Sequence, residues 1–147
     1  MSRTVVTSGL DFSITLTDSS DDALSALRNA LDRALDAIGE EAVGYAKDTL
    51  TAAGRVKTDL LRGSIDTDHD ENTVVIGTNV PYAIWHEVGT GIYASDGGGR
   101  QTPWRFQASD GRWYTTRGVK PLHYLRNAVA DHIPRYKQIL QESLENA

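Results

Sequence analysis

The sequence predicts an α+β domain in which a long N-terminal helix and a kinked C-terminal helix pack on an antiparallel sheet made of hairpins, with a long flexible loop. Three observations carry this prediction. One helical stripe of apolar residues runs through residues 24–46, a second runs through residues 122–144, and two strand pairs with polar turns lie between them. The 147 residues suffice to bury a core, and no repeat or linker divides them. We therefore expect a single domain over residues 1–147.

The first half of the chain predicts one strand and one long helix. Residues 10–17 alternate apolar and polar side chains, which is typical of a half-buried strand. Residues 18–21 offer N-cap side chains, and the helix is expected to stop near Gly54. Its apolar stripe consists of Leu24, Leu27, Leu31, Leu35, Ile38, Ala42, Tyr45 and Ala46. Gly39 and Gly44 inside this helix indicate either a close packing approach, a bend or a tolerated defect.

A short helix and a first hairpin are expected next. Residues 56–65 predict a turn of helix capped by Thr58 or Asp59, followed by the entry to a strand. Residues 65–69 and 73–78 flank a polar cluster, which is a hairpin signal. These two strands are expected to pair antiparallel.

Residues 80–91 separate the two halves and predict a short aromatic helix. Pro81 suits the first helical position, and Gly89 can close the helix in the left-handed conformation. Residues 92–103 show no apolar period and include three consecutive glycines at 97–99. We expect that segment to be a mobile loop.

A second hairpin and a broken helix complete the chain. Residues 104–106 and 112–115 bracket an Asp-Gly turn that follows Ser109. Lys120-Pro121 is expected to open the final helix, and Pro134 interrupts it, so we predict a kink or two helices divided near His132. The apolar stripe of this helix consists of Leu122, Leu125, Val129, Ile133, Tyr136, Leu140 and Leu144.

Composition narrows the classes of function. The 15 Lys and Arg residues against 20 Asp and Glu residues give a net charge of −5, which disfavours a protein that neutralises nucleic-acid phosphate over its whole surface. The absence of Cys excludes disulfides, thiolate metal sites and thiol nucleophiles. No apolar run approaches the roughly 20 residues that span a bilayer, and residues 1–9 lack a signal-peptide core. We expect a soluble protein made in a cytoplasm, with no membrane partner.

Three motif-like patterns fail on spacing. His86-Glu87 resembles the start of a zinc-protease helix, but position 90 is Thr where a second His is required. Residues 66–77 have the alternating oxygens of a calcium loop, but they lack its central glycine and its final Glu. Residues 89–94 fit a loose dinucleotide pattern that ends a helix instead of opening one. We expect no metal and no cofactor.

Two chemical alternatives stay open. His86 beside Glu87 in an aromatic helix next to a flexible loop is compatible with a small hydrolase or nuclease, although an interface or capping histidine is the simpler interpretation. The hairpin over residues 100–120 interleaves cations with aromatic residues and is compatible with a nucleic-acid-binding module, with contact to an acidic protein face, or with an ordinary solvated hairpin. Its cations are Arg100, Arg105, Arg112, Arg117 and Lys120.

Five short blocks carry a resemblance to a known family through their order and spacing. They are Val56-Lys57-Thr58-Asp59-Leu60-Leu61-Arg62-Gly63-Ser64-Ile65, Val75-Ile76-Gly77-Thr78-Asn79, Tyr82-Ala83, Glu87-Val88-Gly89-Thr90-Gly91, and Lys120-Pro121 ahead of Tyr124-Leu125. Together, over roughly residues 56–129, these blocks resemble the tailed-phage neck family, whose members are called tail-completion, head–tail joining or minor capsid proteins. The family typically has Thr-Gly at positions 58–59 and an Arg-Pro-Phe-Leu step at 122–125, and this chain departs from both patterns.

The resemblance implies a structural virion protein that is not an enzyme. Its expected partners are copies of itself in a six-fold ring, the head-side connector or stopper proteins, and the tail terminator or tail tube proteins. Packaged DNA would pass nearby. The expected location is the virion neck, after assembly in the host cytoplasm. A ring contact is head-to-tail and uses two different patches, which a flexible loop and an exposed hairpin can supply.

The candidate assembly-interface residues surround the loop. Aromatic side chains beside flexible backbone are typical of binding surfaces. The candidates are Tyr82, Trp85, His86, Glu87, Gly89, Gly91, Tyr93, Arg100, Trp104, Trp113, Arg117 and Tyr124.

Overall fold

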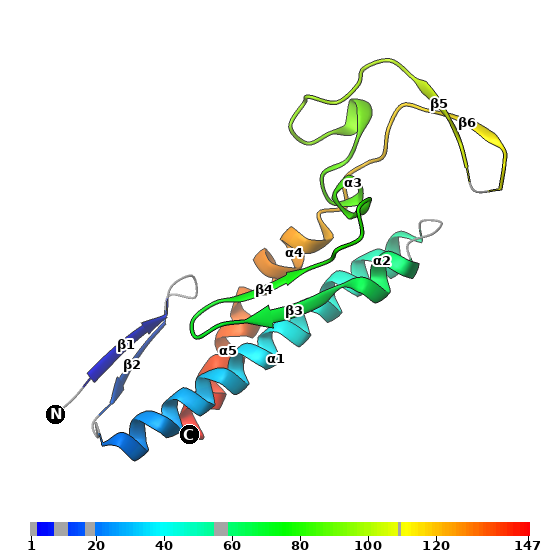
Figure 1. Ribbon diagram of the computed structural model, residues 1–147. Coiled ribbons are helices and arrows are strands. Elements are labelled where there is room, and N and C mark those ends of the chain that lie inside the picture. Colours follow the sequence, from blue (N-terminus) through cyan, green and yellow to red (C-terminus); the bar gives the residue numbers. More distant parts are fainter. Residues whose placement is uncertain (1–2, 8–11, 17–19, 55–58, 109) are drawn as a thin grey trace. The chain divides into compact units, whose positions relative to one another are not determined.

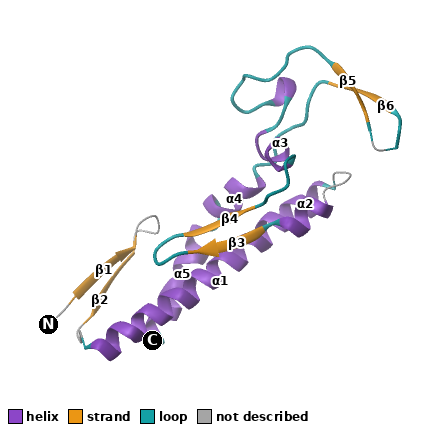
Figure 2. Cartoon of the chain, in the orientation of Figure 1, coloured by secondary structure: helices purple, strands orange, loops and turns teal. Residues whose placement is uncertain are grey.

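The computed structural model describes residues 3–7, 12–16, 20–54, 59–108 and 110–147. These residues form helices and three two-stranded antiparallel hairpins (Figures 1 and 2). The long N-terminal helix, the C-terminal helix and the hairpins confirm the predicted α+β class. In chain order the elements are β1 (Arg3–Thr7), β2 (Phe12–Leu16), α1 (Asp21–Ala53), α2 (Asp59–Ser64), β3 (Asp66–His69), β4 (Val74–Gly77), α3 (Ala83–Val88), η1 (Gly91–Tyr93), β5 (Trp104–Gln107), β6 (Trp113–Thr116), α4 (Tyr124–Ala130) and α5 (Ile133–Glu145).

The chain divides into two compact units. Unit 1 comprises residues 1–45, 66–77 and 128–147, and unit 2 comprises residues 46–65 and 78–127. Because each unit is assembled from separate segments, no linker in the sequence marks the division.

The N-terminal hairpin contains one strand that the sequence pattern predicts and one that it does not. The strand expected over residues 10–17 is confirmed at β2, and its positions 10, 11 and 17 lie outside the described residues. It pairs antiparallel with β1, with Val5 opposite Ile14. β1 was not anticipated because Val5 and Val6 are adjacent and break the alternation that identifies a half-buried strand.

Helix α1 begins and ends where its sequence predicts. The Ser20 hydroxyl accepts a hydrogen bond from the Ala23 N–H at 3.2 Å, which is the geometry of an N-cap. Asp21 and Asp22 in the first turn place negative charge near the positive end of the helix dipole. The helix ends at Ala53, and Gly54 follows in the left-handed conformation with φ +60°.

The core of unit 1 lies between α1, α5 and the hairpin of β3 and β4 (Figure 1). Small residues at Ala34 and Ala42 of α1 leave room for larger side chains from α5. The buried cluster consists of Ala34, Ile38, Ala42, Tyr136 and Leu140, and Val74 and Ile76 of β4 pack against it. Burying a side chain such as Leu140 contributes roughly 1.5–3 kcal/mol. This cluster therefore fixes β4 on the two helices with its apolar face inward.

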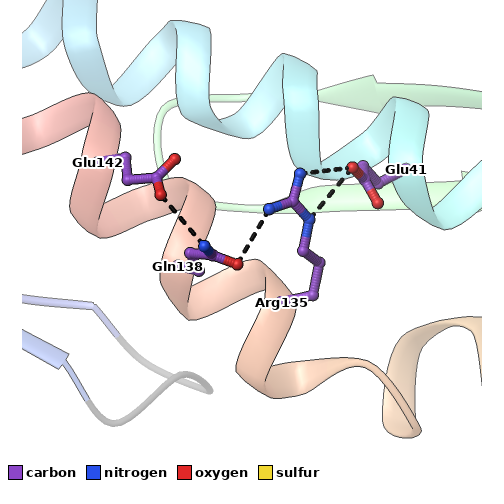
Figure 3. A network of polar contacts seen from close by, with 4 residues as sticks. All are labelled: Glu41, Arg135, Gln138 and Glu142. Carbon is purple, nitrogen blue, oxygen red and sulfur yellow. Dashed lines mark hydrogen bonds and ion pairs between the residues drawn. The ribbon is translucent and has the colours of Figure 1, made fainter.

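A polar network joins α1 and α5 beside this core (Figure 3). The Arg135 guanidinium donates to Glu41 Oε1 from Nε at 3.2 Å and from Nη2 at 2.9 Å, and it also donates to Gln138 at 3.0 Å. Hydrogen bonding to Arg135 lowers the pKa of Glu41. Since both side chains keep substantial exposure, the pair specifies helix register more than it adds stability.

The C-terminal helix divides as predicted but starts later than predicted. His132 precedes α5, and Pro134 lies in the first turn of that helix, where its missing N–H costs nothing. The His132 ring stacks on Tyr45 with centroids 3.5 Å apart. The predicted opening at Lys120-Pro121 is wrong, because α4 begins at Tyr124. The preceding amides bond to another helix, as described below.

The short helix and the first hairpin are confirmed at α2, β3 and β4. Asp59 is the first residue of α2, and the alternative cap Thr58 lies outside the described residues. Asp70 Oδ1 accepts the N–H groups of Asn72 and Thr73 at 2.9 and 2.8 Å, which closes the turn between the strands. These bonds lower the pKa of Asp70.

Gly39 lies at a close contact between α1 and β3, which is one of the explanations that the sequence left open for this glycine. A Cβ placed at Gly39 would collide with the Thr67 side chain on β3, whereas a Cβ at Gly44 meets nothing within 4 Å. Thr67 cannot easily move away, because its hydroxyl donates to the Val75 carbonyl at 2.9 Å. Gly39 therefore serves helix–hairpin packing, and Gly44 does not.

We predict opposite effects of alanine at these two glycines. Gly39→Ala should lower the free energy of unfolding by about 1–3 kcal/mol, because overpacking outweighs the gain in helix propensity. Gly44→Ala, the matched control, should raise it by up to about 1 kcal/mol. Urea unfolding of both variants measures the difference, and equal stabilisation by both would contradict the close approach.

Candidate assembly interface

Helix α3 is six residues long and is closed by Gly89. The predicted closure is confirmed, since Gly89 has φ +78° and its N–H donates to the Trp85 carbonyl at 2.9 Å. The prediction that Pro81 occupies the first helical position is wrong. Tyr82 precedes the helix, and the Ala83 N–H bonds to the Val80 carbonyl, so Pro81 lies inside a turn that leads into α3.

Glu87 connects α3 to the start of α4. Its Oε2 accepts the Leu125 N–H at 2.8 Å, and its Oε1 accepts the Arg126 N–H at 2.9 Å. The first amides of a helix lack partners within that helix, and a carboxylate at this end is also favoured by the helix dipole. Glu87 therefore acts as the N-terminal cap of α4 from a distance of 38 residues in the sequence.

Backbone hydrogen bonds also join the two helices, from amides just before α4 to carbonyls of α3. The Leu122 N–H donates to the His86 carbonyl at 2.8 Å, and the His123 N–H donates to the Glu87 carbonyl at 3.1 Å. His123 adopts φ +50° to make this turn. These bonds explain why α4 cannot start at Lys120-Pro121: the residues before Tyr124 terminate α3.

Tyr124 belongs to the interior of unit 2. Its side chain is fully buried, and its hydroxyl donates to the Ala83 carbonyl at 3.0 Å. Burial raises the pKa of this phenol to about 12. Its assignment to an assembly surface is wrong for this structure, since a residue without exposed area holds α4 against α3 instead.

Gly89 and Gly91 are likewise internal. The Thr90 N–H donates to the Val119 carbonyl at 2.9 Å, and the Ile92 N–H donates to the Arg117 carbonyl at 3.1 Å. A Cβ at Gly91 would collide with the Arg117 carbonyl, and Gly91 has φ +61°. Both glycines are buried, so they permit a close backbone approach and offer no interface side chain.

The loop after α3 is bonded to that helix at its root. A single turn of 3₁₀ helix at Gly91–Tyr93 interrupts the segment expected to lack regular structure. The Ser95 N–H and hydroxyl both donate to the Val88 carbonyl at 2.8 Å. The mobility of residues 93–99 stays a prediction.

The second hairpin is confirmed and carries an exposed array of aromatic and cationic side chains. Phe106 and Tyr114 stack across β5 and β6 with centroids 5.8 Å apart. The Arg105 guanidinium lies 5.5 Å from the centre of the Trp113 ring, whose residue is 58% exposed. Gly111 has φ +82° in the predicted turn, and Ser109 lies outside the described residues.

The remaining candidates differ in exposure. Trp85, Tyr93, Arg100, Trp113 and Arg117 are exposed, whereas Tyr82, His86 and Trp104 are half-buried. The rings of Tyr82 and His86 pack edge to face with centroids 6.0 Å apart, and Arg100 lies over Trp104 at 5.6 Å.

Sequence reasoning missed several exposed apolar side chains. Ile84 and Val88 lie four residues apart on α3, and Phe106 lies on one face of the second hairpin. The spacing of four residues between Ile84 and Val88 was the available sequence signal, because residues four apart lie on the same side of a helix. Together with Trp85, which is 57% exposed, Ile84 and Val88 form an apolar surface on α3.

The side chains of the motif-like patterns that the structure describes are used within the fold. Both oxygens of Glu87 accept backbone amides, so this carboxylate is committed to capping. Within the described ranges, no group of three or more His, Asp or Glu side chains is arranged to hold a metal ion. Asp70, part of the calcium-like run, bonds its own turn.

Comparisons with known proteins give no relative for this geometry. No family model, curated protein or solved structure matches the chain.

In the part of the chain that the structure describes, no helix combines the length and apolar character needed to cross a bilayer.

We predict that removing the Glu87 carboxylate destabilises the junction. Glu87→Ala should lower the free energy of unfolding by about 2 kcal/mol, because two amides lose a charged acceptor. Glu87→Gln, which keeps one acceptor oxygen, should lose less. The control Glu40→Ala, on the exposed side of α1, should change stability by no more than about 0.5 kcal/mol. Urea unfolding decides, and a Glu87→Ala variant as stable as the control would contradict the capping role.

We also predict a loss of stability in alkali. Burial raises the pKa of Tyr124 and of Tyr136 to about 12, above the ordinary value near 10. Between these values the folded state keeps both protons while the unfolded state releases them, so stability falls as pH rises from about 10 to about 12. Tyrosinate absorbance should show at least two Tyr residues that ionise well above pH 10 in the folded protein. Ionisation of all six Tyr residues together near pH 10 would contradict this burial.

Proposed function

We propose that the chain is a neck protein of a long-tailed virus, which forms a ring of its own copies, completes the tail and joins it to the head-side connector or stopper. The observation that supports this proposal is that each of the five motif blocks is hydrogen-bonded to another of the blocks. A resemblance spread over unrelated surface positions would carry far less weight.

The contacts between the blocks run through named atoms. The first block meets the second through the hydroxyls of Ser64 and Thr78, 2.5 Å apart. The third block meets the last through the Ala83 carbonyl and the Tyr124 hydroxyl. The fourth meets the last through the Glu87 carboxylate. The residues that resemble neck proteins are thus the residues on which this part of the fold depends.

The surface of unit 2 also supports a role in assembly. It exposes apolar side chains on α3 and aromatic side chains on the second hairpin, including Trp85 and Trp113. Large exposed apolar groups lower the solubility of a protein unless a partner covers them. They therefore indicate interaction surfaces. By contrast, the hydrolase alternative needs a Glu87 carboxylate that is free to exchange protons, and that carboxylate caps α4.

The decisive experiment interrupts the gene in the virus that encodes it. We expect cells to accumulate filled heads and separate tails, because the neck cannot close. Supplying the wild-type chain from a plasmid should restore joined particles, as should the Gly44→Ala variant, whose site is open. Joined, infectious particles from the interrupted virus would overturn the proposal.

A further inference from the structure

The two units of this acidic protein carry opposite charge. Unit 1 has 15 Asp and Glu residues and 5 Lys and Arg residues, a net charge of −10. Unit 2 has 5 Asp and Glu residues and 10 Lys and Arg residues, a net charge of +5. Half of the unit 2 cations lie in residues 100–120, which hold a single acid at Asp110. This charge separation favours contact between unit 2 of one molecule and unit 1 of another.

The hairpin of β5 and β6 is an exposed part of the basic unit. Phe106 and Tyr114 are opposite each other on one face, and Trp113 with Arg105 lies on the other face. Since all four side chains are exposed, neither face is covered by a core. A two-stranded hairpin alone in water is marginally stable, so this hairpin gains most from a partner that covers it.

The hairpin of β3 and β4 presents a matching face on the acidic unit. Thr67 and His69 point to α1, where Thr67 lies against Gly39 and His69 Nε2 lies 2.7 Å from Asp36. Alternation along the strand therefore places Asp66 and Asp68 on the opposite face. Val75, which is opposite Asp68 in the register and 58% exposed, adds an apolar centre to it.

We propose that the hairpin of β5 and β6 in one copy docks on the outer face of β3 and β4 in a second copy, with the face that carries Arg105 and Trp113 toward Asp66, Asp68 and Val75. The contact is head-to-tail, since it joins two different patches, and it can repeat from copy to copy. It deepens and rests on the proposed function, because it names the contact that would build the ring.

A second copy fits the basic hairpin better than nucleic acid does. Unit 1 carries a net charge of −10 and repels phosphate, so it adds nothing to the binding of a polyanion. The acidic unit 1 of a second copy would instead attract the basic hairpin, and its exposed Val75 adds an apolar contact. Nucleic acid is therefore an outcome that the test must be able to reveal.

The test begins with charge reversal in the purified full-length chain. Analytical ultracentrifugation should show concentration-dependent association of the wild type. Arg105→Glu/Arg112→Glu should weaken it at least tenfold, because the hairpin then carries the same sign of charge as the Asp66 and Asp68 face. The control Arg33→Glu/Arg126→Glu makes the same change of net charge at exposed positions outside the hairpin and should weaken association by less than about threefold. A wild type that is monomeric at every concentration, or equal weakening by the control, would overturn the proposal.

Mixing complementary variants provides the second arm. Asp66→Lys/Asp68→Lys alone should also fail to associate. An equal mixture with Arg105→Glu/Arg112→Glu should associate again, because every contact between unlike variants pairs opposite charges; this also shows that both variants are folded. No recovery in the mixture would overturn the proposal.

Fluorescence anisotropy with a labelled DNA duplex completes the test. If the hairpin reversal abolishes DNA binding and leaves self-association unchanged, the hairpin is assigned to nucleic acid instead.

These outcomes separate the contact from the viral role. The association is measured without any virus, so a monomeric wild type removes the contact whatever the interrupted virus does. The interrupted virus could instead give joined particles while the charge-reversal variants behave as expected. That result would reject the proposed neck function and support the contact between copies.

Discussion

Glu87 joins two helices that are too short to be stable alone, through its carbonyl and its carboxylate. α3 has six residues and α4 has seven, and isolated helices shorter than about 12 residues are marginal in water. Glu87 ends the first helix with its backbone and caps the second with its side chain. Tyr124 adds a buried hydrogen bond between the same two helices. Unit 2 therefore combines this junction with buried apolar side chains such as Leu50 and Leu61.

The junction also fixes the base of the segments that reach solvent. Paired backbone from residues 90–92 and 117–119 leads out from it, and the loop and the second hairpin lie between these two stretches. Glycine at position 91 is required, because a side chain would collide with the Arg117 carbonyl. A rigid base with exposed aromatic and basic groups beyond it suits a protein that assembles with copies of itself.

Local chemistry made much of this fold predictable. The cap at Ser20, the closure at Gly89, the turn at Gly111 and the division before Pro134 each depend on a few neighbouring residues. What failed depends on distant contacts. The start of α4, the burial of Tyr124 and the capping by Glu87 all join residues about 40 positions apart, and no period or turn signal encodes them. The two glycines of α1 differ for the same reason, since only Gly39 lies against β3.

The assembly surface expected around residues 82–124 stays a prediction. The sequence pattern could not separate the exposed aromatic residues there from the buried capping and backbone positions, because burial depends on contacts between distant residues. Native-state hydrogen exchange tests the resulting account most directly. If the junction is a fixed base, the amides of Thr90, Ile92, Leu125 and Arg126 should be strongly protected, with opening free energies near that of global unfolding. Exchange at these amides as fast as in an unstructured chain would contradict it.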